Sequence, residues 1–413
     1  MFDNIPSNWQ ILAIGDIAKI YNGNSINKTV KQTKYTGLSN GRSFIATKDV
    51  AFDGTVTYEN GVKIPSSETN FKTAPADSVF VCSEGGSAGR KTAYVTQEVC
   101  FGNKLFAIVR KSELYNGKYI YYFTRSQLFF KQFQELLNGI IGGVNNKKFA
   151  SIIIPVPPIE EQRRIVSRIE ELFSELDSAV ETLQKTRQQL EIYRQAVLKE
   201  AFENIDIRNY VKLGKIIEKP RYGTSKKCTY DATDSSTAVY RIPNINYEKG
   251  ILDRTDLKYA EFDSNELNGI DLKENDILLI RSNGSVSLVG RTAIVNKKDV
   301  NNTFAGYLIR IRLFEPSTLK TKFLHYYLQS YQARYYIENT AKSTSGVNNI
   351  NAEEIKKLVV PNCDDEFIAP VISNIESRLS VCAKIERTVD EAMQQAEAMR
   401  QSILKKAFEG GFY

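Results

Sequence analysis

The chain has few of the residues on which metal sites and acid–base catalysis usually depend. Its 413 residues include one histidine and five cysteines. No two cysteines form a CxxC pair, so the sequence offers no zinc-type ligand set, and we interpret the cysteines as buried or incidental thiols of a cytoplasmic protein. The cysteines are Cys82, Cys100, Cys228, Cys363 and Cys382. A Ser-His-Asp mechanism would depend entirely on His325, which lies among aromatic residues in a predicted core helix, so we do not expect it to be catalytic.

Long apolar runs and nucleotide-binding motifs are also missing. No apolar stretch approaches the roughly 20 residues that cross a bilayer. The opening MFDNIPSNWQ has neither the basic start nor the apolar stretch of a signal peptide. There is no GxxxxGK or GxGxxG motif, and we interpret the glycine-rich GGSAGR that begins at Gly85 as a turn. Since an Asn-Pro-Pro-aromatic run of an adenine methyltransferase is absent too, the sequence predicts no catalytic residue, no metal site and no cofactor of the chain's own.

Charge is distributed in blocks along the chain, whose formal net charge is +7. Residues 1–150 hold 18 basic and 11 acidic residues, and residues 208–360 hold 24 and 17, so each block carries +7. Residues 151–207 hold 7 basic and 11 acidic residues, and residues 361–413 hold 6 and 9, so these blocks carry −4 and −3. Because a phosphate backbone attracts basic surfaces, the two basic blocks suggest nucleic-acid binding, although charge alone does not decide it.

The two basic blocks are copies of an internal repeat. The segment RQAVLKEAFE at Arg194–Glu203 returns as RQSILKKAFE at Arg400–Glu409, which is 206 residues later. The tetrapeptide GVNN at Gly143–Asn146 returns at Gly346–Asn349. We therefore interpret the chain as a tandem duplication of a unit of about 200 residues, in which a mixed domain precedes a long helix.

Each mixed domain combines short strands with helices rich in aromatic residues. Runs such as Ser78-Val-Phe-Val and Asp276-Ile-Leu-Leu-Ile are typical of strands between Asn, Gly and Ser turns. The stretches KYIYYFTRSQLFFKQFQELL and KFLHYYLQSYQARYYIEN place aromatic residues at helical spacing. We predict that these aromatic residues belong to the core, with base stacking as the alternative.

Two long helices are the clearest structural prediction. Residues 160–202 contain no Pro or Gly, follow Pro157-Pro158, and carry a heptad seam of apolar residues in steps of four and three. The seam residues are Ile165, Ile169, Leu172, Leu176, Ala179, Leu183, Thr186, Leu190, Tyr193 and Val197. Their counterparts 206 residues later are Val371, Ile375, Arg378, Cys382, Ile385, Val389, Ala392, Ala396, Met399 and Ile403, with Leu379 as a substitute for Arg378. An amphipathic helix of roughly 65 Å needs a partner, so we predict that the two helices pair within one chain; a homodimer is the alternative.

Two stretches resemble the specificity subunits of type I restriction-modification systems. The opening IPSNWQILAIGDIAKIYNG is similar to the start of those proteins, where a Pro-x-x-Trp leads into a strand. The segment GGVNNKKFASIIIPVPPIEEQRRIVSRIEELFSELD is similar to their central conserved region, in which a Pro-Pro pair and Glu-Gln lead into a spacer helix. Because both halves follow the same plan, the resemblance covers essentially the whole chain.

The resemblance implies an α+β fold with pseudo-twofold symmetry. In this fold, a tandem-duplicated subunit carries two mixed α/β target-recognition domains separated by two long helices packed as an antiparallel coiled coil. The implied segments are a first target-recognition domain at 1–155, a central spacer helix at 156–207, a second target-recognition domain at 208–361 and a distal spacer helix at 362–413. The implied target is double-stranded DNA with an asymmetric bipartite sequence. The implied partners are two methyltransferase (modification) subunits, with restriction/translocase subunits in the full complex, and S-adenosylmethionine, ATP and magnesium would belong to those partners.

We expect DNA contacts from polar side chains on loops of the two basic domains. The candidates in the first domain are Lys31, Lys34, Arg90, Lys91, Asn145, Lys147 and Lys148. The candidates in the second domain are Arg221, Lys226, Lys227, Arg281, Asn283, Arg291 and Asn348. For the two GVNN segments, the alternative role is to shape the chain before the last strand of each domain.

The second half departs from the family pattern. The residues Pro361-Asn-Cys-Asp-Asp-Glu-Phe367 stand where the first half has Pro-Pro-Ile-Glu-Glu-Gln, and Trp9 has no counterpart near Tyr210. This puts in doubt whether both helix entrances contact a methyltransferase subunit identically. An orphan DNA-binding regulator and a coiled-coil adaptor without a DNA role remain as alternatives, whereas a DNA-mimicking inhibitor would need acidic domains.

Overall fold

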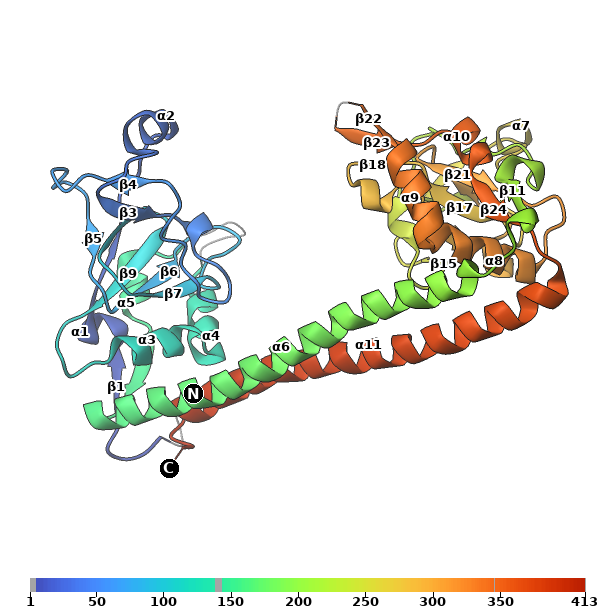
Figure 1. Ribbon diagram of the computed structural model, residues 1–413. Coiled ribbons are helices and arrows are strands. Elements are labelled where there is room, and N and C mark those ends of the chain that lie inside the picture. The colour runs from blue at the N-terminus through green and yellow to red at the C-terminus, as the bar shows by residue number, and fades with distance from the viewer. Residues whose placement is uncertain (1–4, 138–142, 345, 413) are drawn as a thin grey trace. The chain divides into compact units, whose positions relative to one another are not determined.

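The computed structural model describes residues 5–137, 143–344 and 346–412. The chain divides into two compact units (Figure 1). Unit 1 comprises Met1–Gln184 and Asp390–Tyr413, and unit 2 comprises Lys185–Val389. Each unit therefore contains one mixed domain and a segment of each long helix. Among the described residues, no helix is long and apolar enough to span a membrane.

The domain of unit 1 is built on a four-stranded antiparallel sheet in the order β2-β9-β6-β7. Every residue of β6 (Ser78–Cys82) is buried; Val79 and Val81 enter one core, while Phe80 and Cys82 enter another. This alternation follows from the two-residue period of a strand and shows that both faces of the sheet are covered. The other strands are β2 (Ala18–Asn22), β7 (Thr92–Val95) and β9 (Leu105–Arg110).

Helices lie on one face of this sheet, and a second small sheet lies on the other. The helices are α3 (Gly117–Thr124), α4 (Gln127–Glu135) and α5 (Asn146–Ala150). The second sheet has the order β4-β3-β8-β5 and contributes Ile45 and Phe101 to the core around Phe80. Its strands are β3 (Arg42–Ile45), β4 (Lys63–Ile64), β5 (Thr73–Ala74) and β8 (Val99–Phe101). An antiparallel pair of β1 (Gln10–Ala13) and β10 (Ile153–Val156) and the short helix α1 (Ile14–Ile17) complete the domain.

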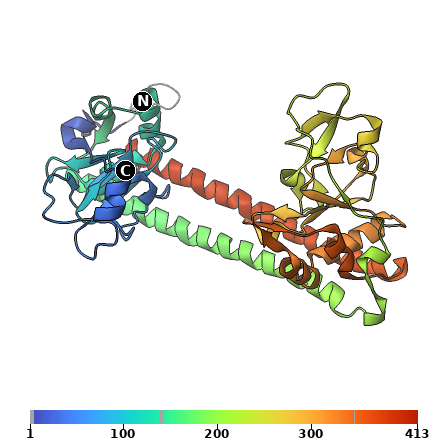
Figure 2. The same cartoon turned by 90° about the horizontal axis from the view of Figure 1, so that it is seen from above.

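Unit 2 repeats this plan with a six-stranded sheet in the order β12-β21-β17-β19-β15-β14. The buried strand β17 (Ile277–Ile280) pairs with β19 (Thr292–Ile294) on one side and β21 (Leu308–Ile311) on the other. The covering helices are α8 (Thr318–Gln329), α9 (Tyr331–Thr340) and α10 (Ala352–Lys357). A second sheet, β16-β13-β20, includes the two yellow strands β13 (Ser236–Tyr240) and β16 (Lys258–Glu261) that lie away from the long helices (Figure 2).

Shorter elements complete unit 2. The strands β11 (Tyr210–Lys212) and β24 (Val359–Pro361) form the antiparallel pair that corresponds to β1 and β10. The remaining elements are β12 (Arg221–Tyr222), β14 (Ile245–Asn246), β15 (Ile251–Leu252), α7 (Ser264–Leu267), β18 (Ser282–Asn283), β20 (Thr303–Phe304), β22 (Lys342–Thr344) and β23 (Val347–Asn349).

The aromatic stretches form core, as the helical spacing predicted. Their fully or nearly fully buried rings are Tyr119, Phe123, Phe129 and Phe133 in unit 1 and Phe323 and Tyr327 in unit 2. Two tyrosines of α9 are exceptions, since Tyr331 and Tyr335 are exposed and their ring centroids lie 6.0 Å apart.

The two long helices pair antiparallel within one chain, as predicted. The helix α6 spans Ile159–Glu203, and α11 spans Asp365–Phe408. In unit 2, Arg194 donates two hydrogen bonds to Glu386, at 2.9 and 2.6 Å. Further along α6, Glu200 accepts a hydrogen bond from Arg378 at 2.7 Å. The partner numbers fall on α11 as they rise on α6, which identifies the pairing as antiparallel, and the seam needs no second copy of the chain to cover it.

Most predicted seam residues are buried or half-buried, but the seam moves by one residue at Tyr193 and Ile385. These side chains are 41% and 40% exposed, and Arg194 and Glu386 occupy the positions between the helices instead. The substitute that the sequence suggested, Leu379, does pack against the core of unit 2.

The same shift occurs in unit 1, where Ala179 and Met399 are exposed. Their neighbours Val180 and Arg400 are half-buried, and Arg400 bonds to Asp177 on the opposite helix. The heptad prediction was wrong at Ala179, Ile385 and Met399 because an α-helix of 3.6 residues per turn drifts away from a strict 3.5-residue repeat. Tyr193 is partly exposed but still contacts the opposite helix, where it accepts a hydrogen bond from Arg378 at 3.0 Å.

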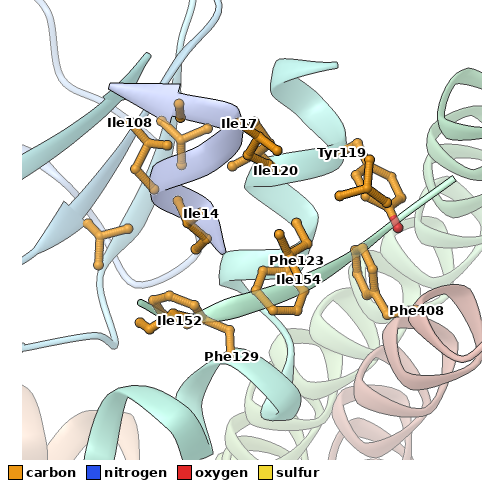
Figure 3. Close-up of a cluster of buried hydrophobic side chains, with 14 of the residues drawn as sticks. Ile14, Ile17, Ile108, Tyr119, Ile120, Phe123, Phe129, Ile152, Ile154 and Phe408 are labelled. Carbon is orange, nitrogen blue, oxygen red and sulfur yellow. The ribbon is translucent and has the colours of Figure 1, made fainter. Parts of the chain in front are cut away.

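Each copy of the repeated ten-residue segment packs against the domain that precedes the other copy. The first copy ends α6 in unit 2, where Val197 and Phe202 enter the core. The second copy ends α11 in unit 1, where Ile403 and Phe408 enter the core. Figure 3 shows Phe408 beside Tyr119 and Phe123 of α3.

The two GVNN segments are not structural equivalents, so that part of the repeat interpretation was wrong. In unit 1, Asn145 caps α5 by accepting a hydrogen bond from the Lys148 amide at 2.9 Å. In unit 2, the corresponding cap of α10 is Asn351, whereas the residues of the second GVNN form the strand β23. The fully buried Phe149 and Ile355 confirm this alignment, which keeps the offset of 206 residues. A shared tetrapeptide is too short to determine register.

Candidate nucleic-acid interface

A short exposed helix carries Lys31 and Lys34 at the end of the unit 1 domain away from the long helices (Figure 1). It begins as α2 (Lys28–Val30) and continues as a π-helical segment, Lys31–Tyr35. Asn27 caps its start by accepting a hydrogen bond from the Thr29 amide at 2.9 Å. Lone π-helical turns are enriched at functional sites, which directs attention to this helix.

The two lysines of this helix have different surroundings. The half-buried Lys31 ammonium lies 5.1 Å from the centre of the Phe44 ring, and burial lowers the pKa of Lys31 while Asp49 opposes that shift. Lys34 is exposed and bonds to Glu68, which raises the pKa of Lys34. Lys31 therefore holds the helix against the domain, and Lys34 is the one whose charge faces solvent.

Arg90 and Lys91 follow the glycine-rich turn at Gly85. This turn is a structural one, as predicted, and Gly89 is required there because its φ is +67° and a Cβ would lie 2.5 Å from the Phe133 ring. Arg90 is exposed. Lys91 is half-buried and donates to the Thr47 carbonyl at 3.2 Å, with its ammonium 5.0 Å from the centre of the Phe52 ring.

Asn145, Lys147 and Lys148 lie together at α5, a different part of the unit 1 surface from the α2 helix. Both lysines are exposed in the last turn of α5, where a cation is favourable. At the offset of 206 residues their counterparts in unit 2 are Glu353 and Glu354 of α10. Any phosphate contact made here is therefore a feature of unit 1 that unit 2 does not share.

In unit 2, Arg281, Asn283 and Asn348 come together at the β18–β23 pair, where Arg281 donates to Asn349 at 3.2 Å. Asn283 and Asn348 face each other in the β18–β23 pair. Arg281 stacks on the Tyr222 ring at 4.6 Å and donates to the Gly306 carbonyl at 3.2 Å. Arg221 is exposed beside Tyr222. The Arg221 guanidinium lies near Gly269, so the β18–β23 pair brings three of the seven candidates of the domain to one place.

The other three candidates of unit 2 lie elsewhere. Lys226 and Lys227 are exposed, and Lys226 bonds to Glu266 at 2.8 Å. Arg291 is half-buried; it donates to Gln329 at 2.9 Å and stacks on Tyr247 at 4.8 Å. Burial lowers the pKa of Arg291, with Arg334 adding to the shift. These contacts give Arg291 a role within the domain, and DNA contact by the fourteen candidates stays a prediction.

An anchor at the start of α6 was missed by the sequence reasoning. The Trp9 indole donates to Glu161 at 2.9 Å, and Asn8 donates to the same carboxylate at 3.2 Å. Gln162 accepts from the Asn116 amide at 2.9 Å and donates to the Pro157 carbonyl at 2.8 Å. Both the Trp motif and the Glu-Gln motif are visible in the sequence, but their contact joins residues about 150 positions apart, which neither motif predicts.

Unit 2 has no counterpart of Trp9, and it has neither a carboxylate nor an amide at the positions that match Glu161 and Gln162. At the offset of 206 residues, Phe367 stands in place of Glu161 and is 41% exposed, while Ile368 stands in place of Gln162 and is buried. The two departures from the family pattern are thus one coupled structural difference between the helix entrances.

His325 is a buried residue of the unit 2 core region. Its Nδ1 lies 2.9 Å from the Thr292 hydroxyl, which also accepts from Gln329 at 2.8 Å. Burial lowers the pKa of His325 to about 4, so the ring is neutral near pH 7. Both the burial and the neutral state agree with the core role that its aromatic neighbours predicted.

Comparison with known proteins shows which proteins this chain is similar to. A family model described as the type I restriction modification DNA specificity domain matches residues 6–191. The EcoKI specificity subunit of a type I restriction enzyme, from Escherichia coli (strain K12), is 28% identical over 363 residues, which cover 82% of this chain and 75% of that protein. The StySPI specificity subunit from Salmonella potsdam is also 28% identical, over 357 residues, with the same coverage.

The fold is shared with a solved chain. A chain from a structural study of complex assembly and conformational transition of the type I R-M system has a TM-score of 0.75. It is 16% identical and covers 98% of this chain and 99% of its own length. The likeness extends over two mixed domains and two long helices.

Proposed function

We propose that this chain is a specificity subunit of the type I restriction-modification family, which it resembles, and that it selects the DNA sequence on which such a complex acts. Its target is bipartite and asymmetric, with one half-site read by the domain of each unit. The observation that carries this proposal is the repetition of one domain plan in two compact units, with basic blocks of +7 in residues 1–150 and 208–360. Two different domains on one chain are suited to two different half-sites.

The chemistry of recognition divides between the two kinds of candidate residue. Exposed cations such as Lys147, Arg90 and Lys227 are suited to phosphate contacts, which position the protein on any sequence. The β18–β23 pair with Arg281 and Asn283 combines cationic and amide side chains, which are the groups that read base edges in the grooves.

The chain acts with partners and without a reaction of its own. Its partners are two methyltransferase subunits, joined by restriction/translocase subunits in the full complex, and S-adenosylmethionine, ATP and magnesium are bound by those partners. The Trp9–Glu161 anchor supports a difference between the two docking sites, since only the α6 entrance has it. The working compartment is the cytoplasm, where the DNA of the cell and the partner subunits meet.

Two measurements test this function. The purified chain, incubated with labelled S-adenosylmethionine and DNA, should transfer no methyl group, whereas the complex with its methyltransferase subunits should methylate one bipartite motif. Methylation by the rigorously purified chain would contradict the non-catalytic role. A complex that methylates the same motif when this chain is omitted would contradict the recognition role.

A further inference from the structure

The helix Lys28–Tyr35 of unit 1 occupies the first of two topologically equivalent connections. In unit 1 the connection runs from Gly23 to β3, which pairs in parallel with β8. In unit 2 it runs from Gly223 to β13, which pairs in parallel with β20. At both glycines an added Cβ would lie about 2 Å from a backbone oxygen, 1.9 Å at Gly23 and 2.1 Å at Gly223, so the two connections start from the same tight geometry.

The two connections differ in what they build. The unit 1 connection forms the eight-residue helix, whereas residues 224–235 of unit 2 form an irregular loop without a helix, with isolated β-bridges at Thr224 and Thr229. A dedicated small core supports the unit 1 helix: Tyr35 is 4% exposed and packs edge-on against Phe71 at 5.6 Å. A structure held by its own core at the tip of a domain is rigid enough to present side chains to a ligand.

The chain segment that contains the helix is basic, although Lys34, Arg42 and Lys48 pair with the nearby carboxylates of Glu68, Glu98 and Asp49. Residues 17–48 hold six basic residues and no acidic residue. The basic residues are Lys19, Lys28, Lys31, Lys34, Arg42 and Lys48. Lys28 and Lys34 are exposed on the helix itself, Lys34 in an ion pair with Glu68, and we expect both to flank the groove of a duplex as phosphate contacts.

The outward face of the helix has the side chains that read bases. With Tyr35 turned inward, helical spacing turns Thr29, Val30 and Thr33 outward and places Gln32 at one flank, and all four are exposed. Gln can pair with the N6 and N7 edge of adenine, and an apolar or Thr side chain can contact the methyl group of thymine. The apolar side chain of Val30 is 43% exposed, and contact with a thymine methyl group would cover it. A helix with side chains is about 10–12 Å across, which matches a major groove about 12 Å wide.

We propose that the helix Lys28–Tyr35 enters the major groove of the first half-site and that Thr29, Val30 and Gln32 determine part of its sequence. This inference rests on the proposed function. Unit 2 reads its half-site with a different element, because its equivalent connection builds no helix.

The test compares methylated motifs of the complete complex. The variants are Gln32→Ala and the triple variant Thr29→Ala, Val30→Ala, Gln32→Ala, with Gln127→Ala as the control, since Gln127 is an exposed glutamine at the start of α4 in the same unit. We expect Gln32→Ala to reduce discrimination at one base pair of the first half-site by about 10- to 100-fold. The second half-site should be unchanged, and the control should keep the full motif.

The outcomes separate this inference from the proposed function. A triple variant that assembles and methylates the unaltered motif would overturn the helix as a reader. A triple variant that keeps its motif but loses a partner subunit would assign the helix to protein docking and would overturn it too. A wild-type complex that recognises no bipartite motif would instead contradict the proposed function, whatever the variants do.

Discussion

Phe202 and Phe408 lie 206 residues apart and make the same pair of ring contacts in the two units. Phe408 lies 5.1 Å from Tyr119 and 5.3 Å from Phe123, measured between ring centroids. Phe202 lies 5.3 Å from Phe323 and 5.2 Å from Tyr327. The tyrosine of each pair donates to a backbone carbonyl of the last strand, Tyr119 to Pro155 at 2.8 Å and Tyr327 to Val359 at 3.0 Å. The C-terminal end of each long helix therefore packs in the same way against the domain of its unit.

The first prediction concerns the packing of Phe408 in unit 1. Replacing the fully buried Phe408 with Ala should destabilise unit 1 by about 3–5 kcal/mol, because it removes a ring and leaves a cavity. Hydrogen exchange should accelerate in β6 of unit 1 and remain slow in β17 of unit 2. Met399→Ala, at an exposed position of the same helix, is the control and should change neither. Equal acceleration in both units would show that they do not unfold as separate units.

The second prediction concerns the anchor at the start of α6. Glu161→Ala leaves the buried Trp9 indole without its acceptor, which should cost unit 1 about 1–3 kcal/mol. Trp9 is the one tryptophan of the chain, so its fluorescence reports unfolding of unit 1 directly. Glu160→Ala, one residue away and exposed, should leave the fluorescence midpoint where it is in the wild type. An unchanged midpoint for Glu161→Ala would show that the indole hydrogen bond does not stabilise the entrance.

The third prediction is a pH dependence of unit 2. The pKa of folded His325 is about 4, because burial disfavours its charged form, while the ordinary value is 6.5. Between these values the unfolded chain binds a proton that the folded chain does not, so stability falls as the pH drops below about 6.5. From pH 7 to pH 5 this should remove about 2 kcal/mol on an order-of-magnitude scale. Denaturant unfolding of His325→Gln at both pH values should lack this increment; an equal loss in the variant would assign it to carboxylates.

The fourth prediction treats α6 as the spacer between half-sites. Inserting four residues beside Thr186 lengthens a helix by about 6 Å while keeping the downstream seam near its original face. The methylated motif of the assembled variant should keep both half-sites and gain one to two base pairs between them, at about 3.4 Å per base pair. An active variant with the original gap would show that something other than this helix sets the spacing.

The periodic parts of the fold were predictable from sequence, and the contacts between distant residues were not. The seam from Ile165 onward and the buried ring of Phe123 follow from spacing alone, because a repeated period reports which face of a helix is covered. The shift to Arg194 and Glu386 required knowledge of the opposite helix. The two GVNN segments were wrongly predicted to be structural equivalents, because a match of four residues is too short to align the two halves of the chain.

The candidate site shows the same division. The charge blocks predicted the two domains, and two of the predicted DNA-contact residues, Lys31 and Lys34, lie on the helix Lys28–Tyr35. Sequence could not show that Lys31 turns inward over Phe44 or that Arg291 is held by Gln329. Those contacts depend on tertiary neighbours, and they leave the exposed Thr29, Val30 and Gln32 of the same helix as the better candidates for base contact.

The most direct test of the two-unit account is an exchange of one domain. Residues 1–155 are replaced by the corresponding domain of a relative with a different known target, and the methylated motif of the assembled complex is mapped. The account predicts that one half-site changes to that of the relative while the other half-site stays as it was. A hybrid that methylates a motif with both half-sites altered, or with neither altered, would contradict independent recognition by the two units.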